Sequence, residues 1–291
     1  MKQARVALFT FLIVLITASI ACAQAAPAAE SGGWFRADRI NAIVLMVLFS
    51  AAIMYYTQRA KRGEKLFIRK MAGLDAVEEA VGRATEMGRP VLFIPGINEI
   101  DVMDTIAGLS ILGRVAKITA RYETPLAVPV RYPMVMAAAQ EVVQQAYIAE
   151  GRGESYNKDT VRYVAGEQMA FTATVNGYMM RERPAANIFM GAFYAESLLL
   201  AETGNAAGSI QIAGTAQPEQ LPFFIAACDY TLMGEELFAA GAYLSHEPLM
   251  LGGLKGQDLM KVLILVAIFV GAVLVTLNLG GEWLQKLFEV R

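Results

Sequence analysis

The sequence predicts an α/β fold: a doubly wound, mostly parallel, Rossmann-like sheet, with transmembrane helices on both sides of the domain in sequence. Short apolar runs alternate with longer helical patterns, which is typical of a parallel sheet covered on both faces. Two uncharged stretches of membrane-spanning length bracket this alternating region. The chain is also 56% hydrophobic and 18% charged, whereas an average soluble domain is about 45–50% apolar and about 25% charged. This composition excludes a disordered chain and indicates a membrane protein.

The composition excludes several kinds of partner and site. With 25 basic and 27 acidic residues the net charge is −2, which gives no electrostatic basis for nucleic-acid binding. Two cysteines, Cys22 and Cys228, are too few for a disulfide framework or a thiolate zinc site. A single histidine, His246, excludes a multi-histidine metal centre. We therefore expect neither a metal nor a cofactor.

The N-terminus has the pattern of a targeting segment. Two basic residues, an uncharged apolar run and several small residues follow one another within residues 1–25. This order is typical of a secretory signal peptide, cleaved here after Ala23 or Ala25. An uncleaved anchor and a lipoprotein signal that uses Cys22 are the alternatives. Residues 26–39 are then a short extracytoplasmic segment.

Two further apolar runs have the length of membrane spans. Residues 40–57 and 262–279 each carry no charge, and about 18 residues is near the lower limit for crossing a bilayer. Basic residues are more frequent after the first run, in 59–70, than before it. Positive charge stays on the cytoplasmic side. We therefore expect residues 58–261 to form one cytoplasmic domain, tied at both ends to the inner membrane.

The C-terminal tail, 280–291, has an amphipathic pattern. Trp283, Leu284, Leu287 and Phe288 stand at helical spacing with polar residues between them. This spacing predicts a short helix in the membrane interface, on the extracytoplasmic side. Packing against a neighbouring protein is the alternative.

The elements of the domain follow from apolar periodicity and from glycine and proline positions. Leu74, Val77 and Val81 stand at helical spacing, and Gly88 ends that helix. Short apolar runs bounded by turn residues mark the strands. The expected helices are 74–87, 101–122, 134–150, 167–181, 185–203 and 229–245, and the expected strands are 90–95, 126–131, 161–165, 209–213 and 223–227.

The loops after the strands hold the candidate ligand-binding residues, because ligands of open α/β sheets bind beyond the carboxyl ends of the strands. Backbone N–H groups of glycine and small polar residues in these loops can receive an anion. The same residues also suit ordinary turns and caps. Neither a glycine-rich dinucleotide motif nor a P-loop motif is present. The candidates are Gly96, Asn98, Gly166, Gly214 and Thr215.

Three carboxylates are the candidate catalytic residues: Asp229, Glu196 and Glu167. Asp229 follows the expected strand 223–227, at the edge where such folds place catalytic groups, and it also suits a helix N-cap. Glu167 lies in a loop of the same kind. Cys228 stands next to Asp229, and the histidine that could activate it, His246, is 18 residues further along the chain. We therefore expect Cys228 to be a small buried residue rather than a nucleophile.

Glu196 stands in an apolar segment and needs a partner if it is buried. Arg181 and Arg183 are the candidate partners. A buried acid with a perturbed pKa suits acid–base chemistry, whereas a structural pair or a contact to another subunit is the alternative.

Several segments resemble an uncharacterised family of bacterial membrane-anchored domains, over roughly residues 66–258. These segments are 82–90, 193–197, 201–205, 211–216 and 228–236. The resemblance implies a bacterial inner-membrane protein. Because the family is a domain of unknown function, it implies no substrate and no catalytic residue.

Two functions from different classes follow from these observations. The first is a non-enzymatic, membrane-anchored cytoplasmic module, oligomeric, with a scaffolding or sensing role. Its partners would be the lipid bilayer and either a second copy or another membrane protein. The alternative is a domain that binds or hydrolyses a small nucleotide- or phosphate-like ligand in the strand-end loops. A pocket at the strand ends favours the alternative, and a filled strand-end face favours the first.

Overall fold

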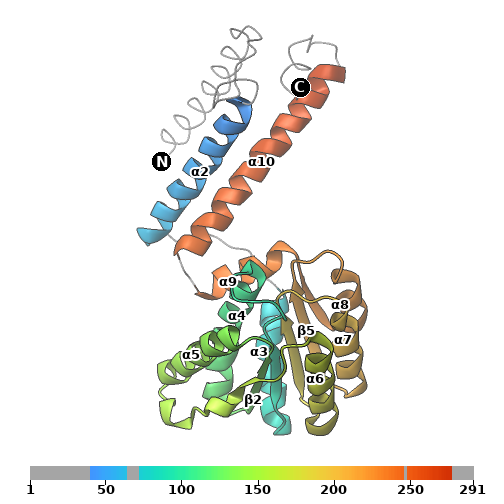
Figure 1. Ribbon diagram of the computed structural model, residues 1–291. Coiled ribbons are helices and arrows are strands. Elements are labelled where there is room, and N and C mark those ends of the chain that lie inside the picture. The colour runs from blue at the N-terminus through green and yellow to red at the C-terminus, as the bar shows by residue number, and fades with distance from the viewer. Residues whose placement is uncertain (1–39, 64–71, 246–247, 277–291) are drawn as a thin grey trace. The chain divides into compact units, whose positions relative to one another are not determined.

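The computed structural model describes residues 40–63, 72–245 and 248–276 (Figure 1). The chain divides into two compact units, one from Phe67 to Glu247 and the other from the two flanking parts of the sequence. The predicted signal peptide, the segment 26–39, the amphipathic tail and His246 lie outside the described residues.

The unit Phe67–Glu247 is an α/β domain with a doubly wound, six-stranded parallel sheet among its described residues. The strand order is β3-β2-β1-β4-β5-β6, and every pairing is parallel. The predicted fold class is therefore confirmed. The strands are β1 (Val91–Ile94), β2 (Leu126–Val130), β3 (Val161–Tyr163), β4 (Ala186–Met190), β5 (Ile210–Thr215) and β6 (Tyr230–Met233).

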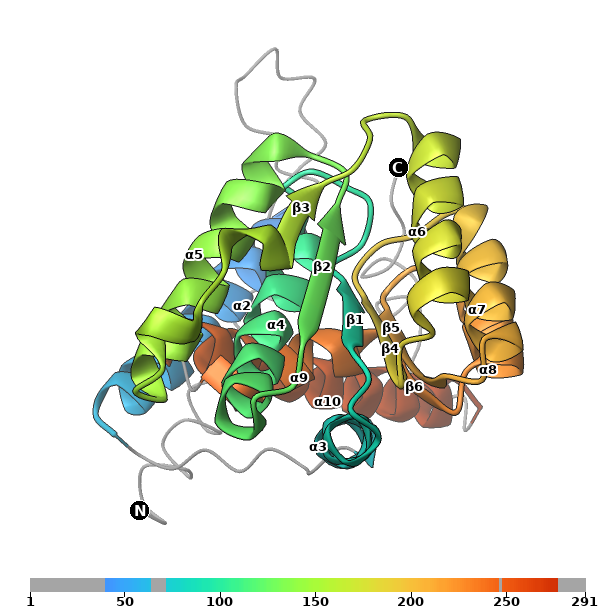
Figure 2. The same cartoon turned by 90° about the horizontal axis from the view of Figure 1, so that it is seen from below.

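Helices cover both faces of the sheet. Figure 2 shows α4 and α5 on one side of the strands and α6 and α7 on the other. The helices are α3 (Ala72–Met87), α4 (Met103–Tyr122), α5 (Pro133–Ala149), α6 (Gln168–Glu182), α7 (Glu196–Ala206), α8 (Leu221–Ala227) and α9 (Glu235–Ser245), and the single-turn helices are η2 (Gly153–Ser155) and η3 (Lys158–Thr160).

Each face of the sheet has its own hydrophobic core. One core joins β1 and β4 to α3, α4, α5 and α9. The other joins them to α6, α7 and α8, and its centre is an aromatic cluster of Phe189, Phe193 and Phe224, with ring centroids 5.3–6.2 Å apart. Full burial of one such side chain stabilises the fold by about 1.5–3 kcal/mol. The central strand β4 is buried along its whole length.

Three predicted elements are wrong, in whole or in part. The expected helix 185–203 is strand β4 followed by helix α7. A strand buried on both faces is apolar at every position, so its pattern cannot be told from that of a buried helix. The expected strand 223–227 is helix α8, which begins with Pro222 in its first turn. The last strand, β6, lies inside the expected helix 229–245.

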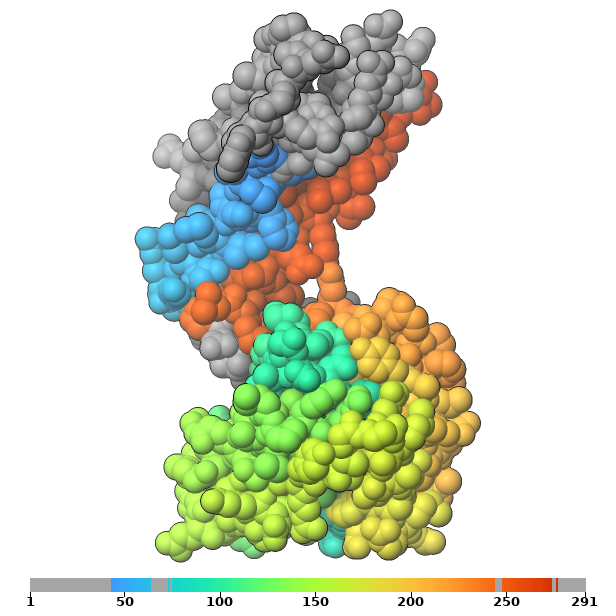
Figure 3. Space-filling view, in the orientation of Figure 1, coloured from blue at the N-terminus to red at the C-terminus, as the bar shows by residue number. Residues whose placement is uncertain are grey.

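The second unit contains an antiparallel pair of helices, α2 (Ile40–Lys61) and α10 (Pro248–Thr276). In Figure 3 the blue atoms of α2 lie against the orange atoms of α10. Among the described residues these two helices are long and apolar enough to cross a membrane, over Ile43–Lys61 and Pro248–Val273. Helix α10 begins well before the span that was expected at 262–279.

Candidate functional site

The strand-end crevice between β1 and β4 is where a sheet of this strand order binds ligands, because the chain leaves these two neighbouring strands in opposite directions. Here the loops that follow the two strands contact each other. The backbone N–H of Ile97 donates to the carbonyl oxygen of Ala192, at 3.0 Å. A Cβ on Gly96 would lie 2.9 Å from backbone atoms of Ala192, and one on Gly191 would lie 2.9 Å from the carbonyl oxygen of Pro95.

These two glycines also have backbone angles that favour glycine, with φ of 78° at Gly96 and 142° at Gly191. Helix α4 also approaches the end of β4 closely, because a Cβ on Gly108 would lie 2.4 Å from the carbonyl oxygen of Met190. Direct backbone contacts therefore fill the switch point. The loop containing Gly96 and Asn98 is part of this packing, and the Asn98 amide donates to the Tyr194 hydroxyl at 3.1 Å.

Arg131, directly after β2, joins three of the strand-end loops. Its Nε donates to the carbonyl oxygen of Gly166 at 2.8 Å, and its Nη1 donates to that of Ile97 at 3.3 Å. The guanidinium also lies 5.1 Å from the ring centre of Tyr132, within the range of a cation–π contact. Gly166, a predicted ligand-binding residue, thus has its carbonyl oxygen in a structural hydrogen bond.

Glu167 is the N-cap of α6. Its carboxylate accepts hydrogen bonds from the backbone N–H groups of Met169 and Ala170, at 3.0 and 2.6 Å. These two bonds, with a smaller effect of Arg131, lower the pKa of Glu167. The carboxylate is therefore held ionised as an acceptor for helix N–H groups, which is a capping role.

Glu196 is fully buried and is the first residue of α7. Its carboxylate accepts from the backbone N–H of Tyr194 at 2.8 Å and from the side-chain amide of Gln168. Two helix N-termini, those of α6 and α7, meet at this carboxylate, and their dipoles favour a negative charge.

The expected arginine partners of Glu196 are wrong. Arg181 and Arg183 lie at the end of α6, which runs from the carboxyl edge of the sheet to its amino edge. Glu196 lies at the carboxyl edge, so no ion pair to either arginine forms among the described residues.

Asp229 lies at the opposite edge from the one predicted. It precedes β6 and does not follow a strand, so it stands at the amino edge of the sheet. Its backbone N–H donates to the carbonyl oxygen of Gln211, and its carboxylate accepts the Gln211 N–H at 2.8 Å. This exchange extends the pairing of β5 with β6. The expected N-cap role is also wrong, because the following helix begins at Glu235.

Cys228 is partly buried beside Asp229. Burial, with a smaller effect of the Asp229 carboxylate, raises the pKa of the Cys228 thiol to about 12. A thiol with this pKa is almost wholly protonated at neutral pH, so it is not a nucleophile. The prediction of an inert residue at this position is consistent with this pKa.

The last predicted pair, Gly214 and Thr215, ends strand β5. A Cβ on Gly214 would lie 2.7 Å from the sulfur of Met190. Thr215 is fully buried, and its hydroxyl accepts from the backbone N–H of Gln217 at 3.2 Å. The Gln217 amide in turn donates to the carboxylate of Asp104 at 3.1 Å.

Sequence reasoning missed the polar residues that organise this edge. They are Asp104, Arg131, Gln168 and Gln217. Each stands within a few residues of the end of a strand or the start of the helix after it, so a search for polar residues at those positions would have found them. Of the candidate ligand residues, Gly166 accepts a hydrogen bond from Arg131, and Thr215 is joined through Gln217 to Asp104. We call these bonds, together with the backbone contacts at Gly96 and Gly191, the packed strand-end edge.

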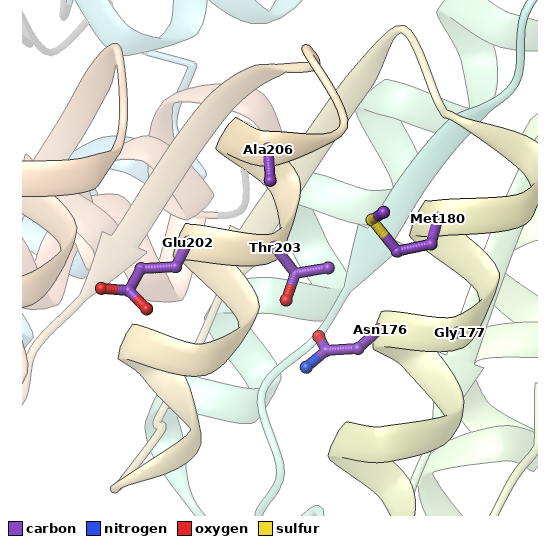
Figure 4. A pocket seen from close by; sticks show the side chains of 6 residues that line it. All are labelled: Asn176, Gly177, Met180, Glu202, Thr203 and Ala206. Atoms are coloured by element: carbon purple, nitrogen blue, oxygen red, sulfur yellow. The ribbon is translucent and has the colours of Figure 1, made fainter.

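Two cavities among the described residues lie elsewhere. A groove of about 430 Å³ lies between α6 and α7, and in Figure 4 Asn176 and Met180 of α6 face Thr203 of α7 while Glu202 points away from α6. A second cavity, of about 310 Å³, is at the amino edge and includes Asp229 in its lining. Neither is formed by the strand-end loops.

Comparison with known families identifies the chain's relatives. A family model with the description "Domain of unknown function (DUF6754)" matches residues 30–288, most of the chain. The chain belongs to this family. The DUF6754 match includes α2, the α/β domain and α10, so the family unites all three. The resemblance to an uncharacterised family is thereby confirmed. Comparison with curated proteins and with solved structures gives no match.

Proposed function

We propose that this protein is a non-enzymatic, membrane-anchored α/β module that self-associates and has a scaffolding or sensing role. The observation that carries the proposal is the packed strand-end edge. At the switch point, where sheets of this order hold ligands, the loops around Gly96 and Gly191 are in backbone contact. Glu167 and Glu196, the acidic candidates at this edge, accept hydrogen bonds that organise helix starts.

Exposed apolar side chains around the same edge support an interaction role. Met103, Met134 and Met169 lie in the first turns of α4, α5 and α6, and Tyr194 lies in the loop after β4. Their exposed fractions are 62%, 66%, 47% and 47%. Methionine side chains adapt to a partner's surface, and apolar groups that gather on a surface usually mark interaction sites. The partner in this proposal is a second copy of the chain.

The placement of the domain in the cytoplasm is part of the proposal. Helix α2 ends in Arg59 and Lys61, and Arg62 follows. Positive charge next to a span remains on the cytoplasmic side, so the α/β domain follows α2 into the cytoplasm. With the resemblance to bacterial membrane domains, this supports a location at the inner membrane.

Native mass spectrometry of the full chain, extracted in detergent, tests the function. We expect a fixed oligomer without a small-molecule adduct. The double variant Met134→Gln/Met169→Gln should shift the oligomer toward monomer. Met87→Gln/Met180→Gln is the matched control, because these methionines are similarly exposed, at 55% and 51%, away from the strand-end edge.

Two results would refute the proposal. One is a monomer at every concentration. The other is a reproducible extra mass that is released on unfolding, which would favour the ligand-binding alternative. The polar groups that favour this alternative are Asp104 and Gln217, together with the buried Thr105 hydroxyl, which has no hydrogen-bond partner within the part of the chain that the structure describes.

A further inference from the structure

The carboxyl edge of the sheet has a large excess of negative charge. It consists of the loops that follow the six strands and the first turn of the helix after each loop, all within the described residues. This edge contains eight carboxylates and one basic side chain, so its formal charge is −7. A partner that binds here therefore approaches an acidic surface. The carboxylates are those of Glu99, Asp101, Asp104, Glu167, Glu196, Glu219, Glu235 and Glu236, and the basic side chain is that of Arg131.

The helix dipoles at this edge reduce the excess but do not cancel it. Among the described residues, the six helices from α4 to α9 all begin here. The N-terminus of a helix carries about half a positive charge, so six helices contribute about +3 and leave about −4. The charge of Arg131 is already included, and two of its N–H groups donate to carbonyl oxygens of its own chain. The edge thus remains acidic.

The carboxylates stand beside the exposed apolar side chains that support self-association. Asp101 precedes Met103 by two residues, and Glu167 precedes Met169 by two residues. All four of these side chains are exposed. A partner that covers the methionines must therefore also approach the carboxylates.

A second copy that binds through this edge brings the same charges to the contact. In a two-fold contact each copy contributes the same surface. Because each surface carries eight carboxylates and one arginine, carboxylates of one copy mostly face carboxylates of the other. Like charges that face each other weaken an interface. Dissolved salt screens this repulsion, since the screening length falls from about 30 Å at 0.01 M to about 8 Å at 0.15 M.

We propose that self-association through the carboxyl edge is opposed by these carboxylates, so that the oligomer becomes more stable as the ionic strength rises. Burial of the exposed methionines favours the contact at every salt concentration, whereas the repulsion is strong only when salt is low. This inference rests on the proposed self-association. It gives the proposed sensing role a physical signal, which is the salt concentration around the α/β domain.

Sedimentation equilibrium of the full chain in an uncharged detergent tests the inference. It gives the association constant at about 0.01 M and at about 0.3 M sodium chloride, between which the screening length falls from about 30 Å to below about 8 Å. We expect the wild-type chain to associate about tenfold more tightly at the higher concentration. Association that is unchanged or weakened by salt would overturn the inference, because weakening indicates a contact with a basic surface.

The triple variant Glu99→Gln/Asp101→Asn/Glu219→Gln removes three exposed charges from the carboxyl edge with little change of shape. With less repulsion to screen, it should associate several-fold more tightly than the wild-type chain at low salt. Its association constant should also change less between the two salt concentrations. A variant that keeps the wild-type association constants at both concentrations would show that these carboxylates do not oppose the contact.

The matched control is Glu86→Gln/Glu182→Gln/Glu202→Gln, which removes the same charge from exposed positions on α3, α6 and α7 outside the carboxyl edge. We expect it to keep the wild-type salt dependence. If it has the same effect as the first variant, the total charge of the chain and not this edge is responsible, and the inference fails. A chain that is monomeric at both salt concentrations would overturn the proposed function itself, whereas an oligomer that does not respond to salt overturns only this inference.

Discussion

Gly108 provides a direct test of the packed strand-end edge. In Gly108→Ala the new Cβ would lie 2.4 Å from the carbonyl oxygen of Met190, where ordinary contacts lie at 3.4–4 Å. The helix or the end of β4 must therefore move by about 1 Å. Overpacking of this kind costs about 1–3 kcal/mol, and a clash with backbone belongs at the upper end. Alanine regains about 1 kcal/mol through its higher helix propensity.

The net expectation is a destabilisation of about 1–2 kcal/mol. For a domain of this size each kcal/mol corresponds to about 2–4 °C in Tm, so Tm should fall by about 2–8 °C. Gly82→Ala is the matched control, because Gly82 also lies within a helix but no atom of the described residues lies within 4 Å of an added Cβ. It should raise Tm by about 2–4 °C.

Thermal unfolding of the detergent-solubilised full chain, followed by far-UV circular dichroism, measures both variants. Opposite shifts of the same transition support the packed edge. If Gly108→Ala raises Tm as Gly82→Ala does, α4 does not approach β4 closely, and the argument for a filled switch point fails.

Three further variants test other parts of the structure. Glu167→Gln should lower Tm at pH 7, because the wild-type carboxylate has a lowered pKa in the folded state. Its contribution is complete above the unfolded pKa and is lost as pH falls through the lower folded pKa. The melting temperatures of the two proteins should therefore converge in acid, and a difference that stays constant with pH would contradict the capping role. Cys228, with a pKa of about 12, should resist a maleimide at pH 7 in the folded Cys22→Ser chain and react once urea unfolds it; rapid labelling of the folded chain would contradict its burial. Phe189→Ala, in the aromatic cluster, should cost about 3–5 kcal/mol in urea unfolding, and a loss below 1 kcal/mol would show that the cluster repacks.

The fold class could be predicted from the sequence because the strands β1, β2 and β5 are short apolar runs between clear helices. The assignment of a segment as helix or strand was wrong where its apolar pattern fits both and only tertiary packing decides between them. β4 is apolar on both faces, since both cores cover it, and a run of this kind also fits a buried helix. Only its pairing with β1 and β5 determines its conformation.

The errors in the candidate site followed from the errors in the strands. Assigning 223–227 as a strand placed Asp229 at the carboxyl edge, whereas β6 begins after it. The partners of Glu196 also could not be predicted from the sequence, because a buried carboxylate is expected to pair with a cation. Here two helix starts provide an amide and a backbone N–H. Neutral groups can supply the hydrogen bonds of a buried carboxylate only where two helices pack in a particular way. The spacing of residues in the sequence does not indicate that packing.

The pairing of β1 with β4 has a consequence for the synthesis of this protein. Val91 pairs with Ala186, about 95 residues later, and a ribosome takes about 5–20 s to add that many residues at 5–20 residues per second. During this interval β1 can pair with β2 but has an open edge on its other side. An open, fully apolar edge strand is a template for pairing with other chains. The nascent protein is thus most prone to aggregate just before β4 emerges, and a chaperone that holds β1 would act in that interval.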